Sequence, residues 1–442
     1  MAPPETLLPR CGRFPVEAES IFLKEFFSDN ENTQTAAMHK PLEDFHRELN
    51  ELFIKACQDH QQGHLEAAES AYCRLLDYFA EIPVLHYNLG LVDYALGRYD
   101  DACRRFSRAA ELQPDDADIL FNLALSRKKS GDIEGAIAGF RQALEISPEC
   151  VDSLYNLAGC QRDKGDHLAA VALYREVLRL APQHHSALSN LAYLYHLLGR
   201  RDEALCAYRR VLELCPDHAS ARHMLAALCG EAVDSPPESY VREVFDNYSN
   251  YFEKSLLLDL EYCVPERLRA MYRRVASEGA RCRHGLDLGC GTGLGGQAFS
   301  GFVDRLDGID LSPKMIALAE KKAIYRKLRP ESIAAYLKRT TDRFDFYLAS
   351  DVMAYLGDLQ ETFLLLRERG RAGTVFLFST EGTPGNGYLL RETGRFAHSA
   401  TYIAQLAKQT GWQVISQETA RLRKERGDWV MGELWLLKMA EG

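Results

Sequence analysis

The residues best suited to chemistry lie in the second half of the chain, around a glycine-rich turn. The segment LDLGCGTG starts as a short apolar run and continues through Asp287, Gly289, Gly291 and Gly293. Glycines let a backbone approach a ligand closely. A second apolar run, LDGID, ends in Asp310, whose carboxylate oxygens can accept both hydroxyls of a ribose. The spacing predicts a site for a nucleoside-containing ligand.

The segments around this turn alternate between strand-like and helix-like patterns. HGLDL, LDGID, FDFYLAS and TVFLFS are short apolar runs, and amphipathic segments such as PKMIALAEKKAIY and ATYIAQLAKQTG lie between or after them. This alternation favours a mainly parallel sheet covered by helices on both faces. Ligands of such sheets bind at the carboxyl ends of the strands, where both acids are expected.

A dinucleotide-binding turn is the main alternative, because residues 291–296 satisfy the pattern GxGxxG. In that fingerprint the first glycine follows the strand directly, and here that residue is Gly289. The third glycine would then fall on Leu294. Asp287 would also crowd a pyrophosphate, whereas it suits a ligand with an amino group. The register therefore disfavours a dinucleotide.

Internal repeats dominate the first half of the chain, at a step of 34 residues. Alanines, aromatic residues and prolines keep the same step as the glycines, which are Gly63, Gly97, Gly131, Gly165 and Gly199. Glycine suits the end of a first helix, and proline stops a second one. The pattern predicts five helix–turn–helix units over about residues 49–216. A lone helix from Pro216 to Gly230 is expected to cap the array with its outer face in water.

One further column of the repeats carries side-chain amides. Its members lie at the same turn of each first helix and are Asn88, Asn122, Asn156 and Asn190. An amide can both donate to and accept from a peptide backbone, so the column could clamp an extended polypeptide. The same amides could instead tie neighbouring helices together, and the sequence leaves both interpretations open.

These motifs resemble two known families. The repeat NLGLVDYALGRYDDA is similar to the tetratricopeptide repeat, and LDLGCGTG with GIDLSPKM is similar to motif I and the acidic loop of class I methyltransferases that use S-adenosyl-L-methionine. LDLGCGTGLGGQAF, ASDVMAYLGDL, GYLLRETGRFAHSATYIAQLAKQTGW and LRKERGDWVMGELWLLK extend the resemblance to bacterial methyltransferases that carry such repeats. The resemblance covers nearly the whole chain. It implies methyl transfer, and it names no acceptor.

The resemblance also implies which residues hold the cofactor S-adenosyl-L-methionine. They are Asp287, Gly289, Gly291, Gly293, Asp310, Leu311, Ser332 and Asp351. Ser332 stands where an acid usually binds the adenine amino group, and Glu331 could serve after a one-residue slip. No metal site is expected, since no His, Cys and carboxylate set has ligand spacing.

Candidates for acceptor chemistry follow the third and fourth apolar runs, FDFYLAS and TVFLFS. His398, Glu381 and Asp351 are candidate catalytic groups, with His398 the proposed general base and Glu381 either a base or an entrance charge. Arg395 could clamp an acceptor carboxylate. Arg395, His398 and Tyr402 would share one helix face if their segment is helical. The expected substrate contacts in this half are Tyr248, Tyr355, Tyr388, Arg395 and Tyr402.

The chain of 442 residues divides into two folded parts on these signals. The fold class is a tetratricopeptide-repeat solenoid followed by an α/β Rossmann-like methyltransferase domain. Pro236 and Pro237 lie in the linker between them. The expected ranges are a tail at 1–40, the solenoid at 41–230, the linker at 231–239 and the methyltransferase domain, with an aromatic helical lid at its start, at 240–442.

The composition of the chain argues against several classes of protein. A net charge of −10 argues against a nucleic-acid binder, and no apolar run approaches the ~20 residues that cross a bilayer. The first residues lack a secretory signal, and none of the 12 cysteines forms a C-x2-C pair. We therefore expect a reduced, cytoplasmic protein.

Three functions fit the sequence. The leading one is methylation of a peptide or protein recruited by the repeat groove. The second is methylation of a small molecule, possibly a carboxylate, with repeats that serve docking or dimerisation, so that a homodimer is possible. The third is a scaffold whose cofactor fold has decayed, which the complete glycine turn and Asp310 disfavour.

Overall fold

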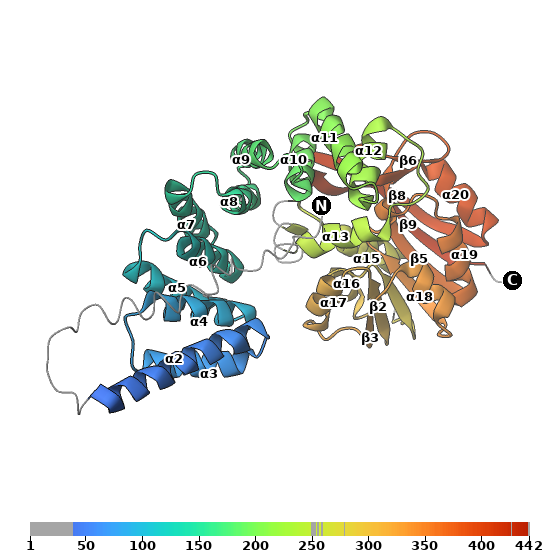
Figure 1. Ribbon diagram of the computed structural model, residues 1–442. Coiled ribbons are helices and arrows are strands. Elements are labelled where there is room, and N and C mark those ends of the chain that lie inside the picture. The colour runs from blue at the N-terminus through green and yellow to red at the C-terminus, as the bar shows by residue number, and fades with distance from the viewer. Residues whose placement is uncertain are drawn as a thin grey trace. The chain divides into compact units, whose positions relative to one another are not determined.

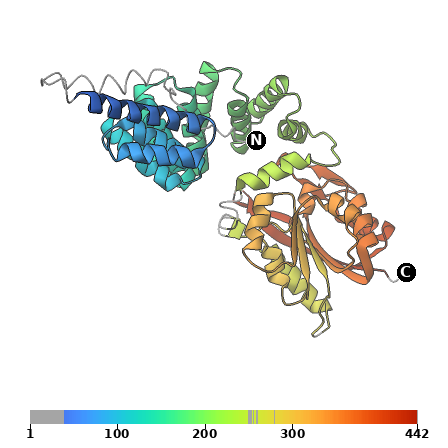
Figure 2. The ribbon, with the colours of Figure 1, turned by 60° about the horizontal axis from the view of Figure 1, so that its bottom comes forward.

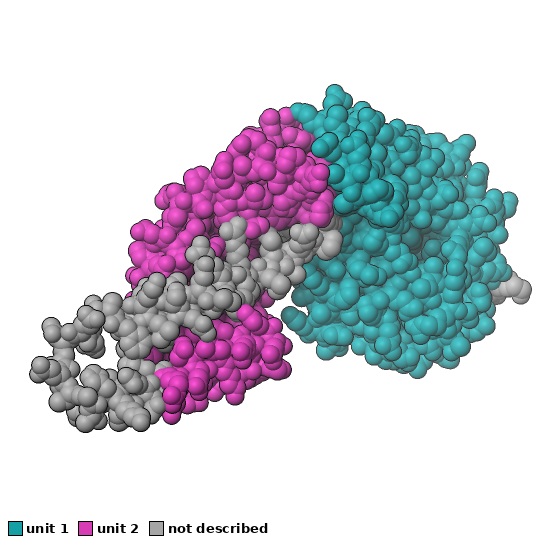
Figure 3. All heavy atoms as spheres, viewed as in Figure 1, with its two compact units in different colours: residues 1–3, 201–442 teal, residues 4–200 magenta. Residues whose placement is uncertain are grey.

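A computed structural model describes residues 39–248, 253, 256, 257, 260–277, 279–425 and 427–440 (Figure 1). Its contacts form two compact units, which Figure 3 colours separately. The first unit reaches Arg200, and the second begins at Arg201. None of the described helices is long and apolar enough to span a bilayer.

The first unit consists of helices that lie side by side in sequence order (Figure 2). They are α2 (His39–Gln61), α3 (Leu65–Leu76), α4 (Pro83–Ala95), α5 (Tyr99–Leu112), α6 (Ala117–Ser130), α7 (Ile133–Ile146), α8 (Val151–Lys164), α9 (His167–Leu180) and α10 (His185–Leu197). The five periodic glycines all adopt positive φ, between +71° and +95°. Glycine adopts this conformation without a Cβ penalty, so the column ends each first helix as predicted.

Helix α6 illustrates how the repeat sequence defines its own limits. The Asp116 carboxylate accepts hydrogen bonds from the amides of Asp118 and Ile119 and so caps the start of the helix. Gly131, at φ +95°, ends it. The predicted aromatic column packs between the helices of each pair, with ring centroids 5.6–5.7 Å apart in three successive repeats. These pairs are Tyr87–Phe106, Phe121–Phe140 and Tyr155–Tyr174.

The second unit is an α/β fold built on one large sheet. Its strands are β1 (Gly285–Leu288), β2 (Leu306–Asp310), β3 (Lys327–Pro330), β4 (Phe344–Ala349), β5 (Gly370–Gly382), β6 (Tyr388–Leu390), β7 (Phe396–His398), β8 (Trp412–Glu425) and β9 (Asp428–Met439). Its helices are α11 (Arg201–Leu214), α12 (Ala219–Cys229), α13 (Glu238–Tyr248), α15 (Val264–Val275), α16 (Leu294–Phe299), α17 (Pro313–Glu320), α18 (Ile333–Arg339), η2 (Met353–Tyr355), α19 (Gln360–Arg369) and α20 (Ala400–Gln409).

The strand order is β3-β2-β1-β4-β5-β7-β6, and β1 to β5 run parallel. The long strand β9 pairs antiparallel with β5, and β8 pairs with β9. The four apolar runs of the sequence are β1, β2, β4 and β5. The predicted fold class, a repeat solenoid followed by a Rossmann-like domain, is therefore confirmed.

Apolar side chains cover both faces of this sheet. Phe346 and Leu348 of β4 pack in a buried cluster that includes residues of α15 and α16. Tyr347 and Ala349, the alternate residues of the same strand, pack in a second cluster with residues of α18, α19 and α20. A strand buried on both faces reads as a continuous apolar run, which explains why FDFYLAS was recognisable.

The last helix in the repeat register, α12, differs from its prediction. Its outer face was expected in water, and this is wrong. Ala226 and Ala227 instead form a buried cluster with Leu390 and Phe396 of the β6–β7 hairpin. The contacts accordingly divide the chain after Arg200, before the linker predicted at 231–239. Periodicity reports the register of the helices, whereas the unit boundary depends on which surfaces they bury.

Candidate functional site

The glycine-rich turn follows β1 and leads into α16. Gly289, Gly291 and Gly293 have φ of +60°, +53° and +95°. A Cβ at Gly289 would lie 2.7 Å from a side-chain carbon of Val352, whereas a Cβ at Gly291 would meet nothing within 4 Å. Gly289 thus permits close packing inside the protein. Gly291 borders open space, where a ligand can approach the backbone.

Asp310 ends β2 and is held by the backbone of this turn. Its Oδ2 accepts from the Gly291 amide at 2.9 Å, and its Oδ1 accepts from the Ser312 amide at 2.8 Å. Burial raises the pKa of Asp310 to about 6; the two amides oppose this shift, and the neighbouring Asp246 adds to it. Each carboxylate oxygen still has a lone pair for a further donor.

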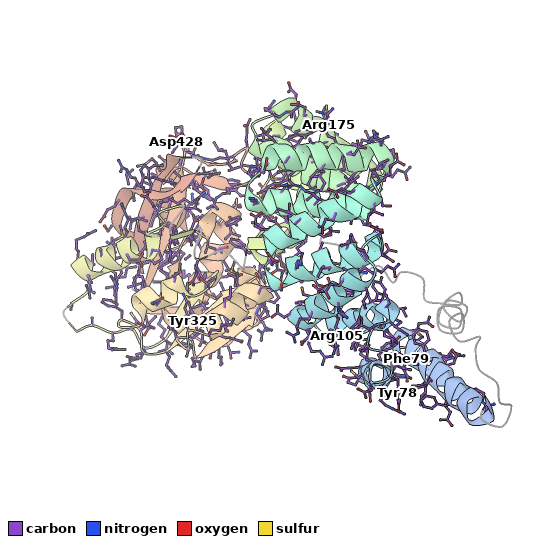
Figure 4. The ribbon with its side chains drawn as sticks, turned by 90° about the vertical axis from the view of Figure 1, so that its left-hand side faces the viewer. Tyr78, Phe79, Arg105, Arg175, Tyr325 and Asp428 are labelled. Carbon is purple, nitrogen blue, oxygen red and sulfur yellow. The ribbon has the colours of Figure 1, made fainter. Side chains whose placement is uncertain are left out.

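Asp287 lies beneath the turn and is 1% exposed. It accepts a hydrogen bond of 2.7 Å from the hydroxyl of Tyr325, which Figure 4 labels on the segment between α17 and β3. Burial raises the pKa of Asp287 to about 7, and the nearby Asp310 contributes to the rise. Among the residues that the structure describes, neither Asp287 nor Asp310 forms an ion pair with a cationic side chain. Two buried acids without a cation attract a positively charged ligand.

Ser332, the expected adenine contact, caps a helix in the structure. The Ser332 hydroxyl accepts from the Ala335 amide at 3.4 Å and caps the start of α18. Glu331, the one-residue alternative, accepts from the Arg339 guanidinium at 2.6 Å. Neither side chain is an acid without a partner, so a role of Ser332 in adenine recognition stays a prediction.

Helix α13 contacts the loop that follows β2, and its role as a lid stays a prediction. Ser312 Oγ donates to the Asp246 carboxylate, and Arg242 Nε donates to the carbonyl of Leu311 at 3.3 Å. The ring of Phe245 meets that of Tyr355 edge-on, with centroids 5.0 Å apart. The side chain of Tyr248, at the end of α13, lies outside the described residues.

An ion-pair network, in which Glu381 and Arg423 are buried and Asp351 and Arg395 are half-buried, joins the ends of β4 and β5. Arg395 donates from Nε to Glu381 at 2.6 Å, from Nη1 to the Tyr355 hydroxyl at 2.6 Å and from Nη2 to Asp351 at 2.8 Å. Arg423 donates to Glu381 at 2.7 Å and to Asp351 at 3.2 Å. Asp351 adopts φ +59°, a conformation that non-glycine residues rarely take and that clusters at functional sites.

The ion pairs of this network restrict the chemistry of Glu381 and Arg395. Although burial opposes it, the guanidiniums of Arg395 and Arg423 lower the pKa of Glu381 to about 2, so Glu381 is a weak proton acceptor at neutral pH. All three nitrogens of the Arg395 guanidinium already donate hydrogen bonds within the network. The network therefore fixes the shape and charge of this edge of the sheet, and it engages three of the five N–H donors of Arg395.

Arg423 was missed in the sequence. It lies on β8, where the pairing with β9 shifts register between Arg421 and Arg423. This bulge turns Arg423 inward, and its side chain is 5% exposed. A bulge of this kind leaves no periodic pattern in the sequence. The basic residues around Arg423 resemble those of an ordinary solvent-exposed edge strand.

His398 and its aromatic neighbours occupy a different cluster. Residues 396–398 form β7 and α20 begins at Ala400, so the expected single helix face is wrong. His398 is fully buried, its Nε2 donates to the Gly357 carbonyl at 2.9 Å, and burial lowers its pKa. Its ring packs against those of Tyr388 and Tyr402. The hydroxyls of these tyrosines donate to Asp234 and Asp358 respectively.

Three of the four asparagines of the column bond to side chains of the preceding repeat. Asn122 Nδ2 donates to the Tyr87 hydroxyl at 2.9 Å, and Asn190 Nδ2 donates to the Tyr155 hydroxyl at 3.2 Å. Asn156 Oδ1 accepts from the ammonium of the preceding repeat's lysine at 3.3 Å. Asn88, the first of the column, is buried in α4, and its Nδ2 has no hydrogen-bond partner among the described residues. The described contacts favour the helix-tying interpretation over a peptide clamp.

One group of potential metal ligands is already neutralised. The side chains of His284, Asp307 and Asp342 bring ligand atoms within 4.8 Å of one another. The Arg326 guanidinium donates to both carboxylates, at 2.6 Å and 3.3 Å, and so supplies the positive charge itself.

Comparisons with known proteins separate the same two parts. A family model of the tetratricopeptide repeat matches residues 60–117, 87–149, 121–185 and 162–219, and a model of a methyltransferase domain matches residues 286–370. No curated protein matches the chain.

Solved structures with similar folds include the N-methyltransferase NodS from Bradyrhizobium japonicum WM9 in complex with S-adenosyl-L-homocysteine, at 17% identity over 45% of this chain and 98% of that one, with a TM-score of 0.37. They also include YrrB, a repeat protein with an unusual peptide-binding site, which is 21% identical over 39% of this chain and 89% of that one, with a TM-score of 0.37. A third is MamA, which is 21% identical over 36% of this chain and 93% of that one, with a TM-score of 0.35. The chain thus joins a tetratricopeptide-repeat array to a methyltransferase domain of Rossmann-like fold.

Proposed function

We propose that this protein transfers a methyl group from S-adenosyl-L-methionine to a peptide or protein that its repeat array recruits. The observation that carries the cofactor assignment is the pair of buried acids at the glycine turn, Asp287 and Asp310, neither of which has a cationic partner among the described residues. S-adenosyl-L-methionine carries an ammonium and a sulfonium, and these charges would stabilise both carboxylates.

The described residues fit the cofactor in two further respects. Asp310 presents two oxygens whose positions are fixed by backbone amides, and each can accept a ribose hydroxyl. Gly291 leaves open the space that a Cβ would occupy. A dinucleotide would bring an anionic pyrophosphate toward the same two acids, which is electrostatically unfavourable.

The chain's own contribution to the reaction is alignment and exclusion of water. When bound, the cofactor supplies the reactive methyl group on its sulfonium. Phe245 of α13 and Tyr355 of η2 pack together over the acceptor side, and the network of Asp351, Glu381, Arg395 and Arg423 fills the edge of the sheet beside them. Such fixed groups hold an acceptor in line with the methyl group without reorganising during the reaction.

The recruitment of a macromolecular acceptor rests on the covalent link between the array and the methyltransferase domain. Repeat solenoids build extended binding surfaces, and a tethered acceptor reaches an effective concentration of roughly millimolar. The carboxylate form of the small-molecule alternative would use Arg395 as its clamp. The three hydrogen bonds of Arg395 to the network do not favour that role.

Two measurements test the proposal. Calorimetric titration with S-adenosyl-L-methionine should give micromolar binding to the intact chain, and Asp310→Ala should weaken it by about tenfold or more, because charge-assisted hydrogen bonds are each worth about 1.5–3 kcal/mol. Asp304→Ala, at a surface carboxylate that pairs with Arg281, is the matched control. Absence of binding would overturn the cofactor assignment.

The acceptor is tested by label transfer. Cell extract is incubated with the intact protein and methyl-labelled cofactor, with the Asp310→Ala variant as the negative control. We expect the label on a protein that gains 14 mass units, and a short peptide from its methylated segment should show a higher KM at similar kcat. Label confined to small molecules, or an equal KM for the short peptide, would overturn recruitment by the array.

A further inference from the structure

Helix α12 belongs to the repeats by its register and to the methyltransferase domain by its contacts. His223 on this helix is 3% exposed, and its Nε2 lies 2.9 Å from the carbonyl oxygen of Gly394, in the loop of the β6–β7 hairpin. A carbonyl only accepts, so His223 is the donor and its Nε2 carries the proton. A residue near the end of the repeat register thereby holds the backbone next to Arg395.

The hairpin loop fits closely against α12 and α13. Gly394 adopts φ +77°, and a Cβ there would lie 2.6 Å from the Tyr240 hydroxyl and 2.8 Å from the Met224 sulfur. The ring of His223 also packs against those of Tyr240 and Phe396, with centroids 4.5 Å and 6.2 Å away. The loop can therefore approach α12 this closely only with glycine at position 394.

The same loop fixes one of the two arginines of the ion-pair network. The amide of Arg391 donates to the Arg395 carbonyl at 2.8 Å, and the amide of Gly394 donates to the Arg391 carbonyl at 2.9 Å. From this backbone the Arg395 side chain reaches Asp351 and Tyr355. The chain of contacts thus runs from His223 through the loop to the tip of β4.

We propose that His223 is a positioning residue, by which α12 holds the hairpin that carries Arg395 and so sets the arrangement of Asp351 and Tyr355 on the acceptor side. The role of this contact in catalysis rests on the proposed function, because the network can position an acceptor only if the protein transfers a methyl group to one. The contact itself is a property of the folded protein and can be measured without an acceptor.

The experiment is hydrogen exchange of the full chain, followed in the peptides that cover residues 388–398 and 350–358. His223→Phe keeps the ring and removes the donor, so we expect about tenfold faster exchange in both peptides. His223→Gln places an amide donor near the same position and should restore slow exchange. His86→Phe is the matched control, because His86 Nε2 makes the same contact with the Ala80 carbonyl at 2.8 Å within the repeats.

Gly394→Ala perturbs the contact from the other side and should accelerate exchange in both peptides in the same way. Faster exchange at 388–398 with no change at 350–358 would show that the contact only packs the hairpin and would overturn the positioning role. Failure of the glutamine variant to restore slow exchange would overturn it as well.

Calorimetry with S-adenosyl-L-homocysteine separates this proposal from the function on which it rests. His223→Phe should weaken that affinity much less than Asp310→Ala does, since the glycine turn and Asp310 are held by other residues and only Asp351, an expected cofactor contact, depends on the hairpin. If the wild-type protein does not bind the ligand, the proposed function fails, while the exchange result still decides the role of His223.

Discussion

The sharpest consequence of the site concerns pH, because two carboxyl groups that would face a cationic cofactor have raised pKa values. The pKa of Asp310 is about 6 and that of Asp287 is about 7 in the ligand-free protein, chiefly because both are buried. A bound cation favours the ionised carboxylates, so binding must expel any proton that they hold. The affinity for S-adenosyl-L-methionine is therefore expected to rise as pH increases from 5 to 7. The ammonium of the ligand stays protonated below about pH 7.7.

The size of this effect follows from linkage. If binding returns Asp310 to its ordinary pKa of 3.8, that group alone strengthens affinity about tenfold between pH 5 and pH 7. The same treatment of Asp287 adds a factor of about 50. At pH 6 these shifts release about 1.4 protons per ligand bound. In the ligand-free protein the raised pKa values act in the opposite direction: their stabilising contribution is complete below pH 3.8 and is lost as pH rises to about 6 and 7.

The assay is isothermal titration calorimetry at pH 5, 6 and 7 in pairs of buffers with different ionisation enthalpies, which counts the protons released. Asp310→Asn should reduce the pH dependence by about the factor assigned to that group, about tenfold. Asp304→Asn, at an exposed carboxylate, should behave as the wild type. An affinity that is constant or decreasing from pH 5 to pH 7, without proton release, would refute the assignment of a cationic ligand to these acids.

Three further predictions concern stability and binding. Arg423→Met removes one cation from the buried Glu381 and the half-buried Asp351, leaving Arg395 and, at 3.8 Å from Glu381, Arg391. Urea denaturation should show a free energy of unfolding lower by about 3–5 kcal/mol, whereas the exposed Arg421→Met should change it by less than about 1 kcal/mol. Similar losses would refute a special role for the network. Gly291→Ala should fold with about 1 kcal/mol of backbone strain and lose cofactor affinity in calorimetry. Gly289→Ala should unfold at a lower temperature, because its Cβ would meet the side chain of a valine. A larger loss of melting temperature in Gly291→Ala than in Gly289→Ala would contradict the geometry. Asn122→Ala breaks a bond to a tyrosine of the preceding repeat and should destabilise the array by about 1–3 kcal/mol in thermal unfolding; an unchanged melting temperature would restore the peptide-clamp interpretation.

The features that the sequence predicted well are those with strict local rules. The glycine columns of the repeats and of the turn after β1 all require positive φ, and they have it. Strands β1, β2, β4 and β5 are apolar runs buried on both faces, so they stand out against the amphipathic helices between them. Asp310 follows from its place at a strand end, because parallel strands direct their carboxyl ends to one edge of the sheet.

The acceptor side was harder to predict, since its geometry depends on contacts between segments far apart in the sequence. The spacing of Arg395 and His398 is compatible with a helix, yet the segment pairs with β5 and β6 and becomes a strand. Tertiary pairing thus overrode local spacing. Arg423 reaches the network from 28 residues further along the chain, through a bulge that no local pattern encodes.

The position of α12 bears on how the two halves of the protein should be separated in any experiment. Periodicity suggests a cut at the predicted linker, 231–239, which would remove α12 together with the repeats. Such a cut would also remove His223, the donor to the hairpin, and would expose Leu390 and Phe396, which α12 buries. A loss of methyl transfer after that cut would therefore report damage to the acceptor side as readily as loss of recruitment. Recruitment by the array is better judged in the intact chain, where the KM of a large acceptor can change while the hairpin keeps its support.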